Sequence, residues 1–88
     1  MLTFTTIKEV KDNLGVWCKG LRKSQKLTQK QLAEELALSP LTISKLEIGE
    51  NPTIETLMKV LQYFNEMDAF NQYLKKRIER VDTNESMY

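Results

Sequence analysis

Apolar residues recur every three or four positions along most of the chain, the spacing that places them on one face of an α-helix. In the first such segment they are Ile7, Val10, Leu14, Trp17, Cys18 and Leu21. The segment starts with Thr6 and Glu9, a capping-box pair that marks a helix N-terminus. We therefore expect a helix over 7–24. Its two internal glycines each disfavour a helix by about 1 kcal/mol relative to alanine, so a bend or a later start near Asn13 stays open.

Two short helices follow, over 29–36 and 40–48, with about three residues between them. The first begins at a second capping box. The second begins at Ser39-Pro40, because serine caps a helix N-terminus and proline suits the first helical position. Gly49 ends this helix as a C-terminal glycine. The apolar positions expected to face inward are Leu32, Ala33, Leu36, Ile43 and Leu46.

Two more helices complete the pattern. The fourth opens at Thr53, and its apolar residues are Ile54, Leu57, Met58, Leu61 and Phe64. After a break, Asp68 is expected to cap a fifth helix over 69–81, whose apolar residues are Phe70, Tyr73, Leu74, Ile78 and Val81. Strand signals are almost absent. The predicted fold class is all-α, a five-helix bundle in one domain over 1–81 with a flexible tail over 82–88.

Composition excludes several classes of protein. A chain of 88 residues with 41% hydrophobic residues suits one small globular domain. Because it holds one cysteine and no histidine, we expect no disulfide, no metal site, no cofactor and no enzymatic activity. Cys18 and its neighbour Trp17 lie on the apolar stripe and are interpreted as core. No apolar run approaches a membrane span and no signal peptide is recognisable, so the expected location is the cytoplasm.

Charge gives a weak global hint and a stronger local one. The net charge is only +1, but residues 1–27 carry six basic side chains against two acidic ones. A local basic surface is typical of nucleic-acid binding, and an ordinary solvated helix face is the alternative.

Two short helices joined by a tight turn have the geometry of a helix-turn-helix, whose second helix enters the DNA major groove. The stretch 21–61 resembles the Cro/cI-type (Xre) family of lambda-repressor-like DNA-binding domains through "LTQKQLAEEL", "S-x-x-T-I-S-K-L-E-x-G" and "P-T-I-E-T-L". This resemblance implies a structural ion pair between Arg22 and Glu47. It also identifies three departures: Ala37 stands where the family usually has glycine, Ile48 where a polar residue is usual, and Glu50 where basic residues often contact phosphate.

The resemblance further implies which residues contact DNA. Carried over position by position, they are Gln29, Pro40, Leu41, Thr42, Ser44, Lys45, Asn51 and Thr53. Lys45 would donate to guanine O6 and N7, and Leu41 or Thr42 would contact a thymine methyl group. Gln29 would hold a phosphate at the start of its helix. Asn51 and Thr53 would do the same at the start of the fourth helix. Outside such a motif, a single exposed lysine is more often solvated than bound to a base.

A looser resemblance concerns "ETLMKVLQYFNEMDAFNQYL", which is similar to the end of HipB-type antitoxins. It implies a homodimer that represses its own operon and binds a HipA-like kinase toxin. The expected dimer or partner surface comprises Tyr63, Phe70, Tyr73, Leu74 and Ile78. Two alternatives stay open. A phage-type Cro/cI-like repressor would share the DNA chemistry, whereas a protein-interaction module would keep the fold and bind no DNA. The near-neutral pI of about 7.8 and Glu50 favour the interaction module that binds no DNA.

Overall fold

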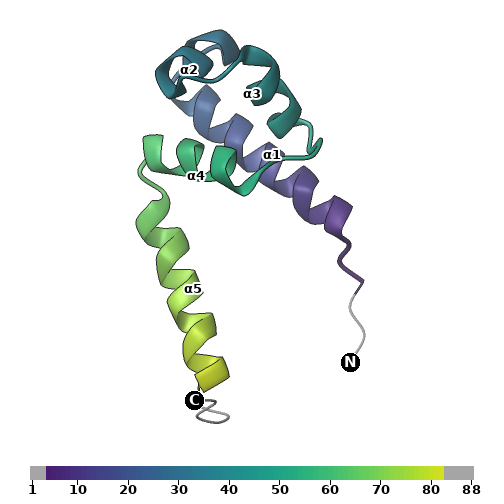
Figure 1. The fold of residues 1–88 in the computed structure, drawn as a ribbon, viewed down its shortest axis with the longest axis vertical. Coiled ribbons are helices and arrows are strands. Elements are labelled where there is room, and N and C mark those ends of the chain that lie inside the picture. Colours follow the sequence, from purple (N-terminus) through teal and green to yellow (C-terminus); the bar gives the residue numbers. More distant parts are fainter. Residues whose placement is uncertain (1–3, 83–88) are drawn as a thin grey trace.

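The computed structural model describes residues 4–82, which form five α-helices and no strand. The helices are α1 (Ile7–Ser24), α2 (Gln29–Leu36), α3 (Pro40–Glu47), α4 (Ile54–Tyr63) and α5 (Met67–Asp82). In Figure 1, α1 to α4 pack together and α5 leads away from them. The predicted all-α class with a helix-turn-helix is confirmed. Of the predicted tail, the first residue belongs to α5, and residues 83–88 lie outside the described part of the chain.

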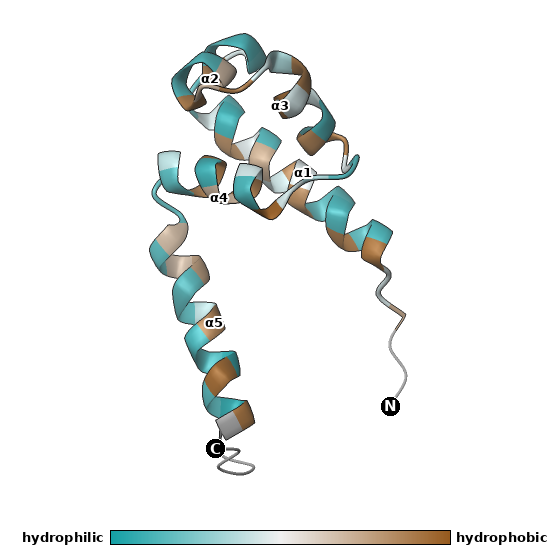
Figure 2. Ribbon diagram, in the orientation of Figure 1, coloured by the Kyte–Doolittle hydropathy of each residue, from teal (hydrophilic) through white to brown (hydrophobic). Residues whose placement is uncertain are grey.

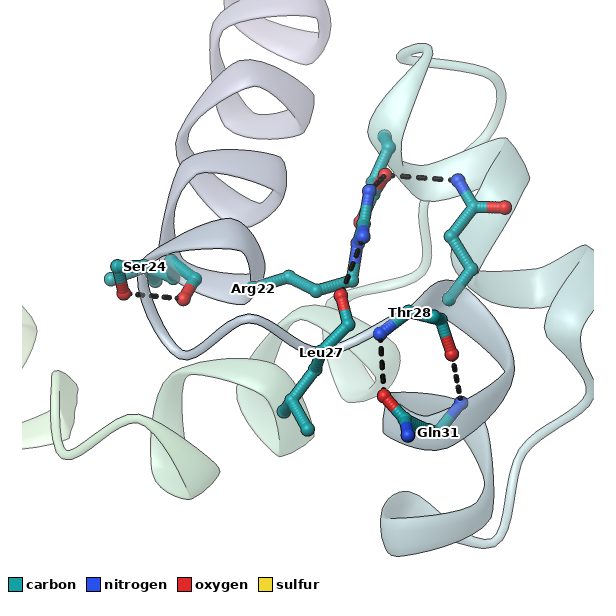
Figure 3. Close-up of polar contacts among 8 residues, drawn as sticks. Arg22, Ser24, Leu27, Thr28 and Gln31 are labelled. Atoms are coloured by element: carbon teal, nitrogen blue, oxygen red, sulfur yellow. Dashed lines mark hydrogen bonds and ion pairs between the residues drawn. The ribbon is translucent and has the colours of Figure 1, made fainter.

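The first four helices begin where the capping signals predict. The hydroxyl oxygens of Thr6, Thr28, Ser39 and Thr53 each accept a hydrogen bond from the backbone N–H three residues further along. At α2 the bond is reciprocal, because the side chain of Gln31 also accepts from the N–H of the capping threonine at 2.8 Å (Figure 3). α1 is one continuous helix from Ile7, and the later start near Asn13 is not observed.

The same helices share one way of ending. The residue at each reversal has a positive φ: Lys26 (58°), Ala37 (56°), Gly49 (76°) and Asn65 (60°). Its N–H and that of the next residue turn back onto carbonyls of the last helical turn. In α3, for example, the two bonds measure 3.1 and 2.8 Å. This is the Schellman motif, which reverses the chain over very few residues. Ala37 therefore makes the turn that the related family usually makes with glycine.

Two predicted boundaries are wrong by one or two residues. α3 ends at Glu47, one residue early. α5 begins at Met67 rather than at residue 69, so Asp68 lies in its first turn and does not cap it. The reason is the reversal at Asn65. There the N–H of Glu66 already closes on a carbonyl of α4 at 2.8 Å, and the next helix starts directly afterwards.

The core consists of two adjoining clusters. One holds Cys18, Leu46, Leu57, Val60 and Leu61, and the other holds Leu32, Ala33 and Ile43. Half-buried Leu36 and Phe64 pack against both clusters and join them. Trp17 packs against the first cluster, so the predicted core role of Trp17 and Cys18 is confirmed. Burial, assisted by the charge of Glu47, raises the pKa of the Cys18 thiol to about 11, and the group stays protonated.

α1 and α3 meet at Gly15. A Cβ atom at this position would lie 2.5 Å from the carbonyl oxygen of Glu47 and 2.7 Å from that of Leu46. These separations are shorter than any side chain tolerates. The absence of a side chain therefore lets the end of α3 rest directly on the backbone of α1.

α5 projects from the bundle formed by α1 to α4 (Figure 1). The radius of gyration is 15.5 Å, against about 12 Å for a compact chain of this length. Phe70, expected on an exposed surface, is half-buried because it packs against the first core cluster. Further along the helix, Tyr73, Leu74, Ile78 and Val81 are 58, 39, 56 and 58% exposed. Figure 2 shows hydrophobic segments (brown) alternating with hydrophilic ones (teal) along α5.

The positive φ of Ala37 predicts a stabilising substitution. A residue with a side chain in the left-handed region destabilises the fold by about 1 kcal/mol or more, and glycine avoids this strain. Part of that gain is offset because glycine loses more conformational entropy on folding. We expect Ala37→Gly to raise the free energy of unfolding by about 0.5–1 kcal/mol, measured by urea denaturation followed by circular dichroism. Glu35→Gly in the same helix is the control and should lower it by about 1 kcal/mol. A loss of stability with Ala37→Gly would contradict the assigned turn.

Candidate nucleic-acid interface

A buried ion pair connects the end of α3 to α1. The Nε and Nη2 atoms of Arg22 donate to the two carboxylate oxygens of Glu47 at 2.6 and 2.9 Å. The two side chains are only 9 and 1% exposed. The remaining Arg22 nitrogen donates to the carbonyl of Leu27 at 2.8 Å, and the amide of Gln29 donates to Glu47 at 3.0 Å. Figure 3 shows the Arg22 side chain reaching to these acceptors.

Both members of the pair are held in their charged forms. Burial alone would raise the pKa of the Glu47 carboxyl group, but hydrogen bonds from Arg22 and Gln29, with the charges of Arg22 and Lys19, outweigh it and lower that pKa. The hydrogen bond to Glu47 likewise raises the pKa of Arg22 against the effect of burial. A buried carboxylate is tolerated here because the three donated hydrogen bonds are directed at its two oxygens.

The ion pair determines which side of α3 faces outward. Glu47 shares the inner side of the helix with the buried residues Ile43 and Leu46. The opposite side carries Pro40, Leu41, Ser44 and Lys45, of which all but the half-buried Ser44 are exposed. Leu41 is 61% exposed. A short helix that presents one apolar, one hydroxyl and one cationic side chain on a single open face has the chemistry needed to contact base edges.

The predicted contact residues fall into three places. Four of them, Thr42, Lys45, Asn51 and Thr53, line one hollow of about 240 Å³ between α3 and the start of α4. The other residues that line this hollow are Leu46, Glu50, Pro52 and Thr56. Pro40, Leu41 and Ser44 lie elsewhere on α3 and are not part of the hollow. Gln29 lies at the start of α2, with its amide nitrogen turned toward Glu47.

The helix-turn-helix family model matches residues 19–68, which is more than half of the chain and spans α2, α3 and α4. The chain belongs to the helix-turn-helix family. The match is of the Cro/cI type, a family of DNA-binding transcription regulators that are generally not enzymes. No curated protein matches the chain. Most of α5 lies beyond the matched region.

Within the helix-turn-helix unit, sequence reasoning missed several contacts. The hydroxyl of Thr42 hydrogen-bonds that of Ser39 at 2.9 Å, and Thr53 donates to Thr56 at 2.9 Å, so both threonines serve helix caps as well. Lys45 lies 4.0 Å from a carboxylate oxygen of Glu50. The sequence does contain a signal for the contact between Lys45 and Glu50. A helix that ends at a glycine such as Gly49 brings the residue after the glycine, here Glu50, close to the residue four positions before the glycine, here Lys45.

Two further observations concern membrane spans and metal-binding clusters. Among residues 4–82, none of the helices is long and apolar enough to cross a membrane. In the same range, no three side chains of the metal-binding types His, Cys, Asp and Glu come together.

The ion pair predicts a large effect on stability that depends on pH. Glu47→Ala leaves Arg22 charged and buried without its partner, so we expect the free energy of unfolding to fall by about 3 kcal/mol at pH 7. The carboxylate stabilises the fold above its ordinary pKa of about 4.3, and this contribution is lost as pH falls through the lower pKa of the folded protein. The difference between wild type and variant should therefore narrow in acid.

Urea denaturation from pH 7 to pH 3 measures this difference. Glu34→Ala, which removes an exposed carboxylate from α2, is the control and should behave like wild type at both pH values. Glu47→Ala unfolding within a few tenths of a kcal/mol of wild type at pH 7 would rule out the buried pair.

Proposed function

We propose that the protein is a sequence-specific transcriptional repressor that binds DNA as a dimer, with the outer face of α3 in the major groove. The open face of α3, held in place by the ion pair on its inner side, carries this proposal. Residues 1–81 would act as one DNA-binding domain. Its site of action is the cytoplasm, where we place its DNA target.

Five of the eight predicted contact residues have a proposed role. Lys45 donates to guanine O6 and N7 through its ammonium group, and Leu41 packs on a thymine methyl group. Gln29 uses the second N–H of its amide, beyond the one given to Glu47, to hold a phosphate at the start of α2. Asn51 and Thr53, both exposed, do so at the start of α4.

Substitutions on α3 and at the start of α2 test these roles. Lys45→Ala and Leu41→Ala should each weaken operator binding by about 1–3 kcal/mol while the circular dichroism spectrum is unchanged. Gln29→Ala should weaken binding to all sequences alike, because phosphate contacts carry little sequence information. Selection of bound duplexes from a random pool identifies the operator, and fluorescence anisotropy then gives the affinities.

Lys76→Ala removes an exposed cation from α5 and is the matched control, with affinity unchanged. If Lys45→Ala retains full affinity for both the operator and a scrambled duplex, α3 is not the recognition helix.

Dimerisation would supply the affinity that one small unit lacks. Two copies bound to half-sites about 34 Å apart double the DNA contacts. The support for α5 as the seam is its projection from the bundle and its exposed residues Tyr73, Leu74 and Ile78. Tyr63, 39% exposed at the end of α4, would extend this surface, and half-buried Phe70 would support it from beneath.

The seam predicts a difference between the two sides of α5. Ile78→Asp should convert the dimer to a monomer, because it places an unpaired charge in an apolar contact. Gln72→Asp adds the same charge on the opposite side and should leave the dimer intact. Truncation after Asp82 should also preserve the dimer, whereas truncation after Ala69 should abolish it. Light scattering at tens of micromolar measures all four, and a monomeric wild type would contradict the seam.

We further propose that the repressor is the autoregulating antitoxin of a HipA-like kinase toxin. The resemblance of 55–74 to HipB-type antitoxins supports this role, as does an exposed apolar stripe outside the matched DNA-binding region. Co-purification with a co-expressed HipA-like kinase tests the role. A phage-type Cro/cI-like repressor is the second candidate and would bind no kinase.

An interaction module that binds no DNA is favoured by one observation, the carboxylate of Glu50 beside Lys45. Salt titration separates it from a repressor, because a protein that neutralises phosphates loses affinity steeply as salt rises.

A further inference from the structure

The end of α3 brings two opposite charges together at the proposed DNA surface. Gly49, with φ 76°, donates its N–H to the carbonyl of Leu46 at 3.1 Å, and Glu50 donates its own to the carbonyl of Lys45 at 2.8 Å. These are the two bonds of the Schellman motif, which usually places an apolar pair at the positions of Lys45 and Glu50. Here the backbone holds an ammonium and a carboxylate side by side instead.

The pair lies in the open. The Lys45 Nζ and a Glu50 carboxylate oxygen are 4.0 Å apart, and the two side chains are 50 and 52% exposed. Both line the hollow that also contains Asn51 and Thr53, two proposed phosphate contacts. A surface pair at this distance is weak, so DNA can break it. Either side chain can therefore respond to a nucleic acid at the hollow.

The charge of the interface depends on this pair. Lys45 is the one cation among the eight predicted contact residues, and Glu50 cancels it. A phosphate approaching the hollow consequently meets no net positive charge there. On a duplex of unrelated sequence, Lys45 can only reach a phosphate, and the Glu50 carboxylate beside it lies close to that phosphate and repels it.

At an operator the same carboxylate has a different effect. An ammonium group has three N–H donors, so Lys45 can bond guanine O6 and N7 while its Nζ stays near Glu50, from which it lies 4.0 Å away. The base edge lies inside the groove, away from the phosphates that Glu50 repels. The unfavourable contribution of Glu50 then acts chiefly on complexes with the wrong sequence.

We propose that Glu50 is a specificity-determining residue, which acts through Lys45 to weaken binding to non-operator DNA more than binding to the operator. This inference rests on the proposed DNA-binding function. It assigns the acidic departure from the family's usual phosphate-contacting residue a role in discrimination, rather than in loss of DNA binding.

Glu50→Gln tests the inference, because it keeps the shape of the side chain and removes its charge. The affinity for a scrambled duplex should rise about threefold to tenfold, as expected for one surface charge near a phosphate. The logarithmic salt dependence on that duplex should steepen by about 0.9, the value for one added phosphate contact. The affinity for the operator should change by less than about twofold, since the guanine contact already stabilises Lys45.

Two controls accompany the measurement. Glu35→Gln removes the same charge from an exposed site on α2 outside the hollow, and should change neither affinity. In a Lys45→Ala background, Glu50→Gln should no longer favour the scrambled duplex over the operator.

The outcomes separate this inference from the proposed function. Equal gains on both duplexes, no gain on the scrambled one, or the same selective gain without Lys45 would overturn it. Failure of the wild-type protein to bind any selected duplex would instead overturn the proposed function, and the inference with it.

Discussion

A carboxylate buried under α3 determines how the proposed DNA-binding surface is presented. Glu47 lies 25 positions from Arg22 in the sequence, and their bidentate contact joins the last turn of α3 to α1. Arg22 also donates a hydrogen bond to the carbonyl of Leu27, and Gln29 donates one to Glu47. The same hydrogen-bond network therefore includes the start of α2. Since a buried charge without these donors is strongly destabilising, α3 cannot rotate about its axis without breaking the fold. The outward direction of Leu41 and Lys45 follows from this constraint.

The helix ends complete the arrangement. Four reversals with positive φ bring successive helices together over short connections, and only one of them uses glycine. The other glycine that matters, Gly15, lets α3 lie on the backbone of α1 at the level of the ion pair. Close approach and charge pairing thus act at the same crossing. The surface that remains exposed on α3 is small, which explains why a single charged pair, Lys45 and Glu50, can set its electrostatic character.

The sequence predicted those parts of the fold that depend on local chemistry. The capping residues Thr28 and Ser39 located two helix starts because their hydroxyls act within three residues. The start of α5 was misplaced because Asp68 is a typical capping residue, whereas the reversal at Asn65 lets the helix begin at Met67. The direction of α5 is set by tertiary packing of Phe70, which periodicity does not encode. Most predicted contact residues lie on or beside α3. The hydrogen bond from Gln29 to Glu47 was not predicted, because it joins two helices and depends on the tertiary fold.

Helix α3, which carries the proposed recognition face, and the projecting α5 lie toward opposite ends of an elongated molecule, 47 Å along its longest axis (Figure 1). This separation has a consequence for gene duplication. A duplicated copy can acquire substitutions at Tyr73 or Ile78, in the proposed seam, while α3 and its ion pair stay as they were. The reverse change, at Leu41 or Lys45, alters the proposed DNA-binding surface and leaves the exposed residues of α5 intact. Two descendants of this chain can therefore diverge in their associations and in their DNA sites by separate, short series of mutations.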